Sequence, residues 1–163
     1  MEKEDRVTDR LRLAECYHEA GHAIVAHAYD FRFAELRVPT DDAAYAGAVA
    51  ERFQWPPITT SRQSFIEVML AGGCGETMWR QKLGDYSVSR LARYDTRDIG
   101  HVLGLTDDEV GDQMEYHLQS VFDLLRAKWR SVNAIATLLE YRQTVPYKLF
   151  GEVMWLRSAE IGN

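Results

Sequence analysis

The sequence predicts a mainly α-helical domain with a small β-sheet, an α+β fold. Apolar residues recur at helical spacing over most of the chain, and one short segment alternates between apolar and polar residues. Hydrophobic residues make up 46% of the chain and charged residues 27%, which is enough for one globular core. We expect residues 1–163 to form a single domain.

The N-terminal part is expected to form a long helix followed by a pair of strands. The helix is predicted over residues 8–29, with Thr8 as a suitable N-cap. Residues 31–38 alternate between apolar and polar side chains with one slip, and predict a short strand that ends at Pro39. Residues 45–53 are expected to return as a second strand.

A second helix is predicted to begin near residues 59–61 and to continue towards Trp79. Gly72, Gly73 and Gly75 fall inside it. Because glycine is unfavourable inside a helix, these residues indicate either close backbone packing or a break.

The rest of the chain predicts a C-terminal helical bundle. A short helix is expected over residues 96–103, and the capping box that starts at Thr106 opens a long helix that continues to Leu125. Another helical stretch covers residues 131–141. Residues 144–146 fit the start of a last helix, with proline near its first position.

The charge balance argues against nucleic acid as a partner. Lys and Arg total 19 against 25 Asp and Glu, a net charge of −6, and no basic patch is visible in the sequence. No apolar run has the length that a bilayer requires, and no apolar stretch after residues 1–6 has the pattern expected of a signal peptide. Cys16 and Cys74 lack zinc-finger spacing. We therefore expect a cytoplasmic protein with reduced thiols and no membrane partner.

The predicted first helix contains the motif H-E-x-x-H, as His18-Glu19-Ala20-Gly21-His22. Residues four apart lie one helical turn above one another, so both imidazoles can bind one Zn²⁺ ion. Glu19 is rotated away from the histidines and can accept a proton from water that the metal acidifies. The motif therefore predicts the hydrolysis of peptide bonds.

A catalytic zinc ion usually has a third protein ligand and one open position. If residues 95–101 are helical, three candidate ligands share one face, and spacing alone does not choose among them. Two glutamates are also chemically acceptable. The candidates are Asp95, Asp98, His101, Glu67 and Glu76.

Several other residues are assigned structural roles. At about 100° per residue, His27 points away from His18 and is expected to be half-buried or exposed. Cys16 and Cys74 are expected to be buried thiols, and His117 is expected on a solvated helix face. The tryptophans are expected to be core or interface anchors: Trp55, Trp79, Trp129 and Trp155.

With these motifs the chain resembles the peptidase domain of the FtsH-type ATP-dependent zinc metalloproteases. The resemblance covers residues 11–153 and rests most firmly on residues 18–26, which are close to that family's extended motif. Weaker similarities follow in the family's order. They are Gly47 in the returning strand, residues 60–63 leading into Leu70-Ala71-Gly72-Gly73, Asp98-Ile99, and Leu138-Leu139-Glu140.

The resemblance implies a zincin-like active-site helix followed by a short strand pair. Carried over residue by residue, it makes His18, His22 and Asp98 the zinc ligands and Glu19 the general base. It also implies that the returning strand, at residues 45–49, is an edge on which an extended substrate could lie.

The chain departs from the family in ways that affect function. It contains no Walker-type motif and no membrane anchor, so hydrolysis is expected to be ATP-independent and limited to flexible or unfolded protein segments. Residues 94–97 stand where the family usually has Gly-Ala, and we expect this difference to alter the approach to Asp98 and the zinc. At the end of the second predicted helix, Glu76 is within about one residue of the position where the family has an acidic residue.

Two functions follow from this comparison. One is an active zinc metalloendopeptidase with a protein or peptide substrate. The other is a non-catalytic metal-binding or protein-interaction module with the same fold. FtsH-type enzymes form hexameric rings, so a homo-oligomer is compatible with the resemblance.

Overall fold

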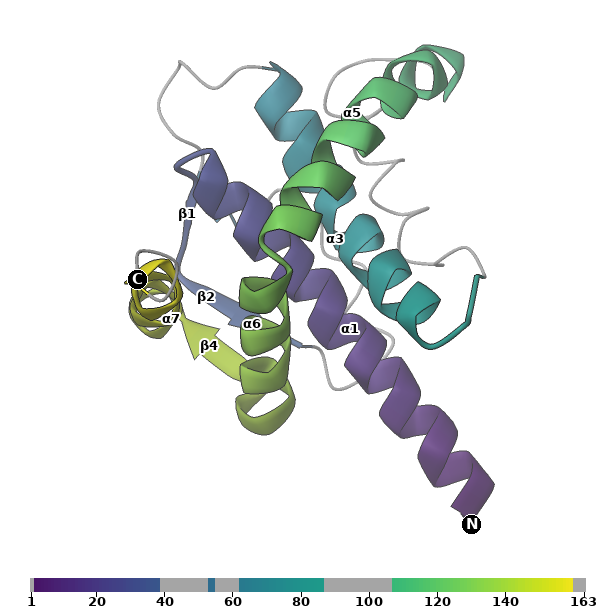
Figure 1. The fold of residues 1–163 in the computed structure, drawn as a ribbon, viewed down its shortest axis with the longest axis vertical. Helices are drawn as coiled ribbons and strands as arrows, with labels where there is room; N and C mark the ends of the chain where they lie inside the picture. Colours follow the sequence, from purple (N-terminus) through teal and green to yellow (C-terminus); the bar gives the residue numbers. More distant parts are fainter. Residues whose placement is uncertain (1, 39–52, 55–61, 87–106, 160–163) are drawn as a thin grey trace.

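The computed structural model describes residues 2–38, 53–54, 62–86 and 107–159 (Figure 1). Over these residues the chain is mainly helical, with short antiparallel strand pairs, which confirms the predicted fold class at this level. The helices are α1 (Glu2–Ala28), α3 (Arg62–Lys82), α5 (Asp107–Ala127), α6 (Trp129–Arg142) and α7 (Tyr147–Ala159). The strands are β1 (Arg32–Phe33), β2 (Glu35–Arg37), β3 (Phe53–Gln54) and β4 (Thr144–Pro146).

Helices α1 and α3 pack against each other along the centre of the described fold (Figure 1). Glycines permit their close approach. A Cβ on Gly21 would lie 2.3 Å from the main-chain oxygen of Ala71, and a Cβ on Gly75 would lie 2.7 Å from that of Tyr17. No side chain fits at such distances, so the two backbones are in contact. Helix α3 continues without a break through its three glycines, and close packing is the correct interpretation for Gly72 and Gly75.

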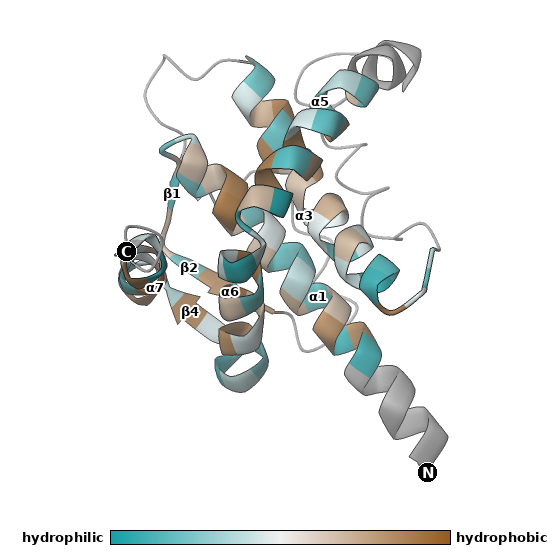
Figure 2. Cartoon of the chain, viewed as in Figure 1, coloured by the Kyte–Doolittle hydropathy of each residue, from teal (hydrophilic) through white to brown (hydrophobic). Residues whose placement is uncertain are grey.

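The remaining helices cover this central pair. Helix α6 packs on α1, α5 packs on α3, and α7 packs on α6 and β4. Figure 2 shows apolar stretches of α1 and α3 near the place where these helices meet α5. The largest fully buried side chains include Phe31, Ile24, Met69, Leu125 and Phe150. None of the described helices is both long and apolar enough to cross a bilayer.

The strand predicted over residues 31–38 is two strands with different partners. β1 pairs antiparallel with β3, and β2 pairs antiparallel with β4, which places Leu36 opposite Val145. The division falls at Ala34, whose main-chain oxygen accepts a hydrogen bond from the N–H of Tyr147 at 3.0 Å.

The burial pattern changes at the same point. Phe31 and Phe33 are buried before the division, and Leu36 and Val38 are buried after it, so the buried face moves by one residue. This change is the slip in the sequence alternation. Of the predicted returning strand, residues 45–52 lie outside the described residues, and the described strand β3 begins at Phe53.

Two predicted helix starts are wrong. Helix α1 begins at Glu2 and not at Thr8, because the charged residues before Thr8 are good helix formers. Residues 144–146 form strand β4 and not a first helical turn, and α7 begins at Tyr147. Val145 is buried in this strand pair, and Pro146 is its last residue, where the ladder tolerates the missing N–H.

Three other helices lie where the sequence predicts them. The long helix expected after Thr106 is α5, and the helix expected over residues 131–141 is α6, which starts at Trp129. The helix predicted near residues 59–61 is α3, which starts at Arg62. The short helix predicted over residues 96–103 lies outside the described residues.

Candidate metal and peptidase site

The histidines of the motif face each other on consecutive turns of α1. Their Nε2 atoms lie 3.0 Å apart, and both side chains are buried. Zinc–imidazole bonds are about 2.0–2.1 Å long, so two nitrogens at this separation can both contact one ion. The helical spacing of His18 and His22 therefore produces the convergence that a shared metal requires.

The other ring nitrogen of His22 determines its tautomer. Its Nδ1 lies 2.7 Å from the main-chain oxygen of Val68 in α3. A carbonyl oxygen only accepts, so Nδ1 carries the hydrogen and the neutral ring has its lone pair at Nε2. The Nε2 contact with His18 then requires either a proton or another cation between the two rings. Hydrogen bonding of the distal ring nitrogen to a carbonyl is typical of metal-binding histidines.

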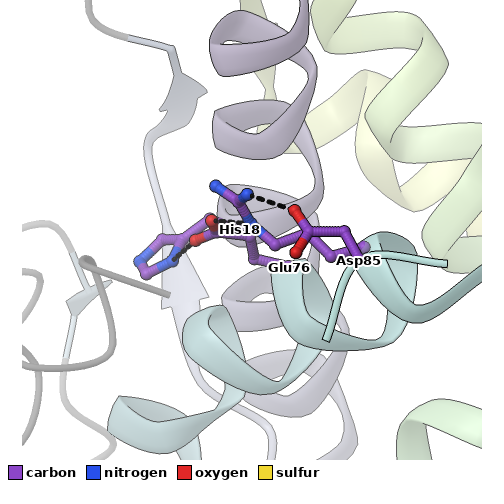
Figure 3. A network of polar contacts seen from close by, with 4 residues as sticks. His18, Glu76 and Asp85 are labelled. Carbon is purple, nitrogen blue, oxygen red and sulfur yellow. Dashed lines mark hydrogen bonds and ion pairs between the residues drawn. The ribbon is translucent and has the colours of Figure 1, made fainter. Parts of the chain in front are cut away.

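The other ring nitrogen of His18 faces a chain of charged groups from α3 and the segment that follows it (Figure 3). Its Nδ1 lies 3.7 Å from Oε2 of Glu76, whose side chain is only 1% exposed. The Nε of Arg80 donates to Oε1 of Glu76 at 2.7 Å, and an Arg80 Nη donates to Asp85 at 3.0 Å. Burial acts to lower the pKa of Arg80, but its two carboxylate partners outweigh burial and raise the pKa. Arg80 therefore holds the Glu76 carboxylate in place beside His18.

The residue facing the two histidines is Gly72. A Cβ at this position would lie 2.3 Å from Nε2 of His22 and 2.5 Å from Nε2 of His18. These distances are close to the length of a zinc–nitrogen bond. The missing side chain thus leaves free the space in front of both donors, and the imidazole donor set is one that zinc prefers. The described part of the site fits a zinc ion.

Glu19 follows His18 on α1 and is buried, with 4% of its surface exposed. It lies in the same helical turn as the first histidine, which is where the sequence predicts the general base. Its burial keeps the carboxylate away from bulk water.

The preferred third ligand, Asp98, lies outside the described residues, as do the alternatives Asp95 and His101. Within the described ranges, no group of three or more His, Cys, Asp or Glu residues is arranged to hold a metal ion. The structure separates the two glutamate alternatives from the imidazole donors. Glu76 faces the distal Nδ1 of His18, and Glu67 is bound to other side chains.

Glu67 forms a buried polar cluster that the sequence did not predict. The hydroxyl of Tyr29 donates to its Oε2, Gln63 donates to its Oε1 at 3.1 Å, and Nδ1 of His117 lies 3.2 Å from the same oxygen. His117 is 9% exposed, so its assignment to a solvated face was wrong. The four-residue spacing of Gln63 and Glu67 was the only sequence signal for this cluster, because Tyr29 lies in the turn after α1 and His117 lies in α5.

The remaining histidine and the thiols have structural positions. His27 is half-buried and packs edge-on against Phe150, as predicted for a non-ligand. Both cysteines are buried thiols that form no disulfide with each other. Burial raises the pKa of Cys16 to about 12, which keeps this thiol protonated and makes it a poor metal ligand or nucleophile.

The tryptophans differ in their positions. Trp79 and Trp129 both stack on Tyr17, at ring-centroid distances of 5.3 and 5.8 Å, and so join α3 and α6 to α1. Trp155 is 71% exposed and does not belong to the core of the described chain. Trp55 lies outside the described residues.

No protein-family model and no curated protein matches this chain.

Proposed function

We propose that this protein is a zinc-dependent metalloendopeptidase that resembles the FtsH-type peptidase domain. The observation that carries the proposal is the pair of Nε2 atoms 3.0 Å apart, with both distal nitrogens facing acceptors on α3. A chance occurrence of the motif on a surface helix would not explain why another helix brings a carbonyl to one ring and a carboxylate close to the other.

The proposed zinc ligands are His18, His22 and Asp98. Bound zinc would act as a Lewis acid that lowers the pKa of water and polarises a carbonyl group. The carbonyl of Val68 accepts a hydrogen bond from Nδ1 of His22, so that this ring presents its lone pair at Nε2. The carboxylate of Glu76 lies 3.7 Å from Nδ1 of His18 and acts on that ring through its charge.

Glu19 is the proposed general base. Its carboxylate accepts a proton from the attacking water and then passes that proton to the nitrogen of the leaving amine. These transfers need a carboxylate that lies close to the histidine pair. Glu19 is the adjacent residue on the same helix and is buried with that pair.

The proposed substrates are flexible or unfolded protein segments. The 163 residues contain no Walker-type motif, so this chain by itself would hydrolyse without ATP the segments that already reach the site.

The first experiment measures zinc content in the purified protein and in His22→Ala and Asp98→Ala variants. One zinc per chain in the parent and its loss in both variants is expected. Zinc retained in Asp98→Ala would exclude Asp98 as a ligand and favour His101 or Asp95.

The second experiment separates catalysis from metal binding. Cleavage of casein-like unfolded substrates should disappear in Glu19→Gln while zinc content is unchanged. Equal cleavage by the parent and Glu19→Gln would exclude Glu19 as the base.

One observation favours a second function, a non-catalytic metal-binding or interaction module. His18, Glu19 and His22 are each at most 4% exposed, and structural zinc sites are closed whereas catalytic sites keep an open position. Zinc bound by a protein that cleaves no unfolded substrate would support this second function over the first.

A further inference from the structure

A basic pocket is lined by residues of the C-terminal helices and includes neither His18 nor His22. Its volume is about 400 Å³, and it is formed where α5 ends, α6 begins and the last turns of α7 pass. We call it the α6–α7 pocket. Its lining residues are Arg126, Ala127, Lys128, Trp129, Arg130, Ser131, Met154, Arg157 and Ser158.

The charge of the α6–α7 pocket is opposite to that of the whole chain. Four of the nine lining residues are Lys or Arg and none is acidic, although the chain carries a net charge of −6. Asp123 pairs with Arg126 at 2.6 Å, and Arg157 also has an interaction partner, so only Lys128 and Arg130 are counted towards the charge of the pocket. The pocket therefore keeps an excess of positive charge, which favours an anionic ligand.

The start of α6 adds a second, independent feature. This helix of 14 residues begins beside the pocket at Trp129, its N-cap residue is Lys128, and that residue makes no side-chain cap. The first turn contains no acidic residue. Helix N-termini carry a partial positive charge and are usually capped by Ser, Thr, Asp or Asn. An anion in the pocket would lie beside this helix start, which follows the C-terminal end of α5 at Ala127 by one residue.

The other lining residues favour an organic ligand with several oxyanions. Ser131 supplies a hydroxyl donor, the hydroxyl of Ser158 donates to the main-chain oxygen of Met154 at 2.9 Å, and the side chain of Met154 is apolar and buried. The volume falls within the range of small-molecule sites and exceeds what one phosphate fills. We propose that the α6–α7 pocket binds a small molecule with two or more phosphate groups, held by Arg126, Lys128, Arg130 and Arg157.

The test is isothermal titration of the full-length protein with tripolyphosphate, ATP and adenosine. Tripolyphosphate and ATP should bind, their affinities should fall as NaCl rises, and adenosine should not bind at the same concentrations. Tripolyphosphate alone isolates the phosphate groups, and ATP tests whether an organic part adds affinity. Failure of both phosphate compounds to bind at low salt would overturn the proposal.

Charge-removal variants locate the site. Arg130→Gln should weaken tripolyphosphate binding about tenfold, because it removes a charge-assisted hydrogen-bond donor. Arg157→Gln is a second variant with the same expected effect. Lys148→Gln is the matched control, because it removes one exposed cation from α7 about 13 Å along that helix from Arg157. Equal losses in all three variants would show general electrostatic attraction and overturn the pocket assignment.

Two further arms separate this proposal from its alternatives. Tripolyphosphate affinity should be unchanged in His22→Ala, since the pocket does not use the zinc site; its loss there would place the phosphate on the metal and overturn the assignment. An acidic peptide such as oligoglutamate should bind more weakly than tripolyphosphate. Tighter binding of the peptide would overturn the phosphate assignment in favour of a protein partner.

Discussion

The Nδ1–H of His22 donates to the main-chain oxygen of Val68 at 2.7 Å, and this bond connects the motif helix to α3. It places the imidazole lone pair at Nε2, 3.0 Å from Nε2 of His18. The bond can form because Gly21 lets α1 approach the backbone of α3 at Ala71. Packing of two helices thus controls both the orientation and the tautomer of a proposed zinc ligand.

Gly72→Ala tests the space in front of the imidazoles. The new methyl group would lie 2.3 and 2.5 Å from the two Nε2 atoms, so we expect loss of bound zinc in metal analysis. Gly151→Ala is the matched control, because a Cβ there meets nothing within 4 Å and should leave zinc content unchanged. Full zinc occupancy in folded Gly72→Ala would contradict the placement of the metal between these histidines.

Gly21→Ala tests the contact between α1 and α3. Its Cβ would meet the main-chain oxygen of Ala71 at 2.3 Å, and a backbone atom cannot rotate away. We expect a loss of about 1–3 kcal/mol in the free energy of unfolding, measured with urea. Gly151→Ala, in open space on α7, should instead be neutral or stabilising by up to about 1 kcal/mol. Equal stability of the two variants would disprove tight packing at Gly21.

Glu76→Gln tests the charged group behind His18. Removing the carboxylate should weaken zinc affinity about 10- to 100-fold, because groups of this kind orient the ring and raise its basicity. The measurement is competition with a zinc-binding dye, and the control is Glu115→Gln, which neutralises an exposed carboxylate on α5. Identical zinc affinities in the two variants would mean that Glu76 has no effect on the site.

The pH dependence of stability tests the Glu67 cluster. Burial would raise the pKa of Glu67, but hydrogen bonds from Tyr29, Gln63, His117 and Ser120 outweigh it and hold the pKa below its ordinary value of 4.5. A depressed carboxyl pKa stabilises the fold above 4.5, and this contribution is lost as pH falls through the lowered value.

The expected measurement is the melting temperature from pH 7 down to pH 3. The parent should lose stability below pH 4.5 more steeply than Glu67→Gln, which has no titrating group at this position. At pH 7 the variant should be less stable by about 1–3 kcal/mol, because a buried hydrogen-bond network is disturbed. Parallel curves for parent and variant would rule out Glu67 as the titrating group.

Spacing along one helix was sufficient to predict the local part of the site. Because α1 has 3.6 residues per turn, residues 18 and 22 must share a face wherever that helix packs. The glycines of α3 were visible too, but the sequence left close packing and a break equally open. The alternation of apolar and polar residues also showed a slip within residues 31–38. It did not show that this slip separates two strands with different partners.

Contacts between distant segments were decided only by the tertiary structure. Val68 and Glu76 reach the rings of His22 and His18 because two glycine-lined backbones touch, and no periodicity of either helix encodes that pairing. His117 was misassigned for the same reason, since its partner Glu67 is 50 residues away along the chain. Helical spacing is local and can be read from sequence, whereas the groups that set a histidine's orientation come from whichever helix packs against it.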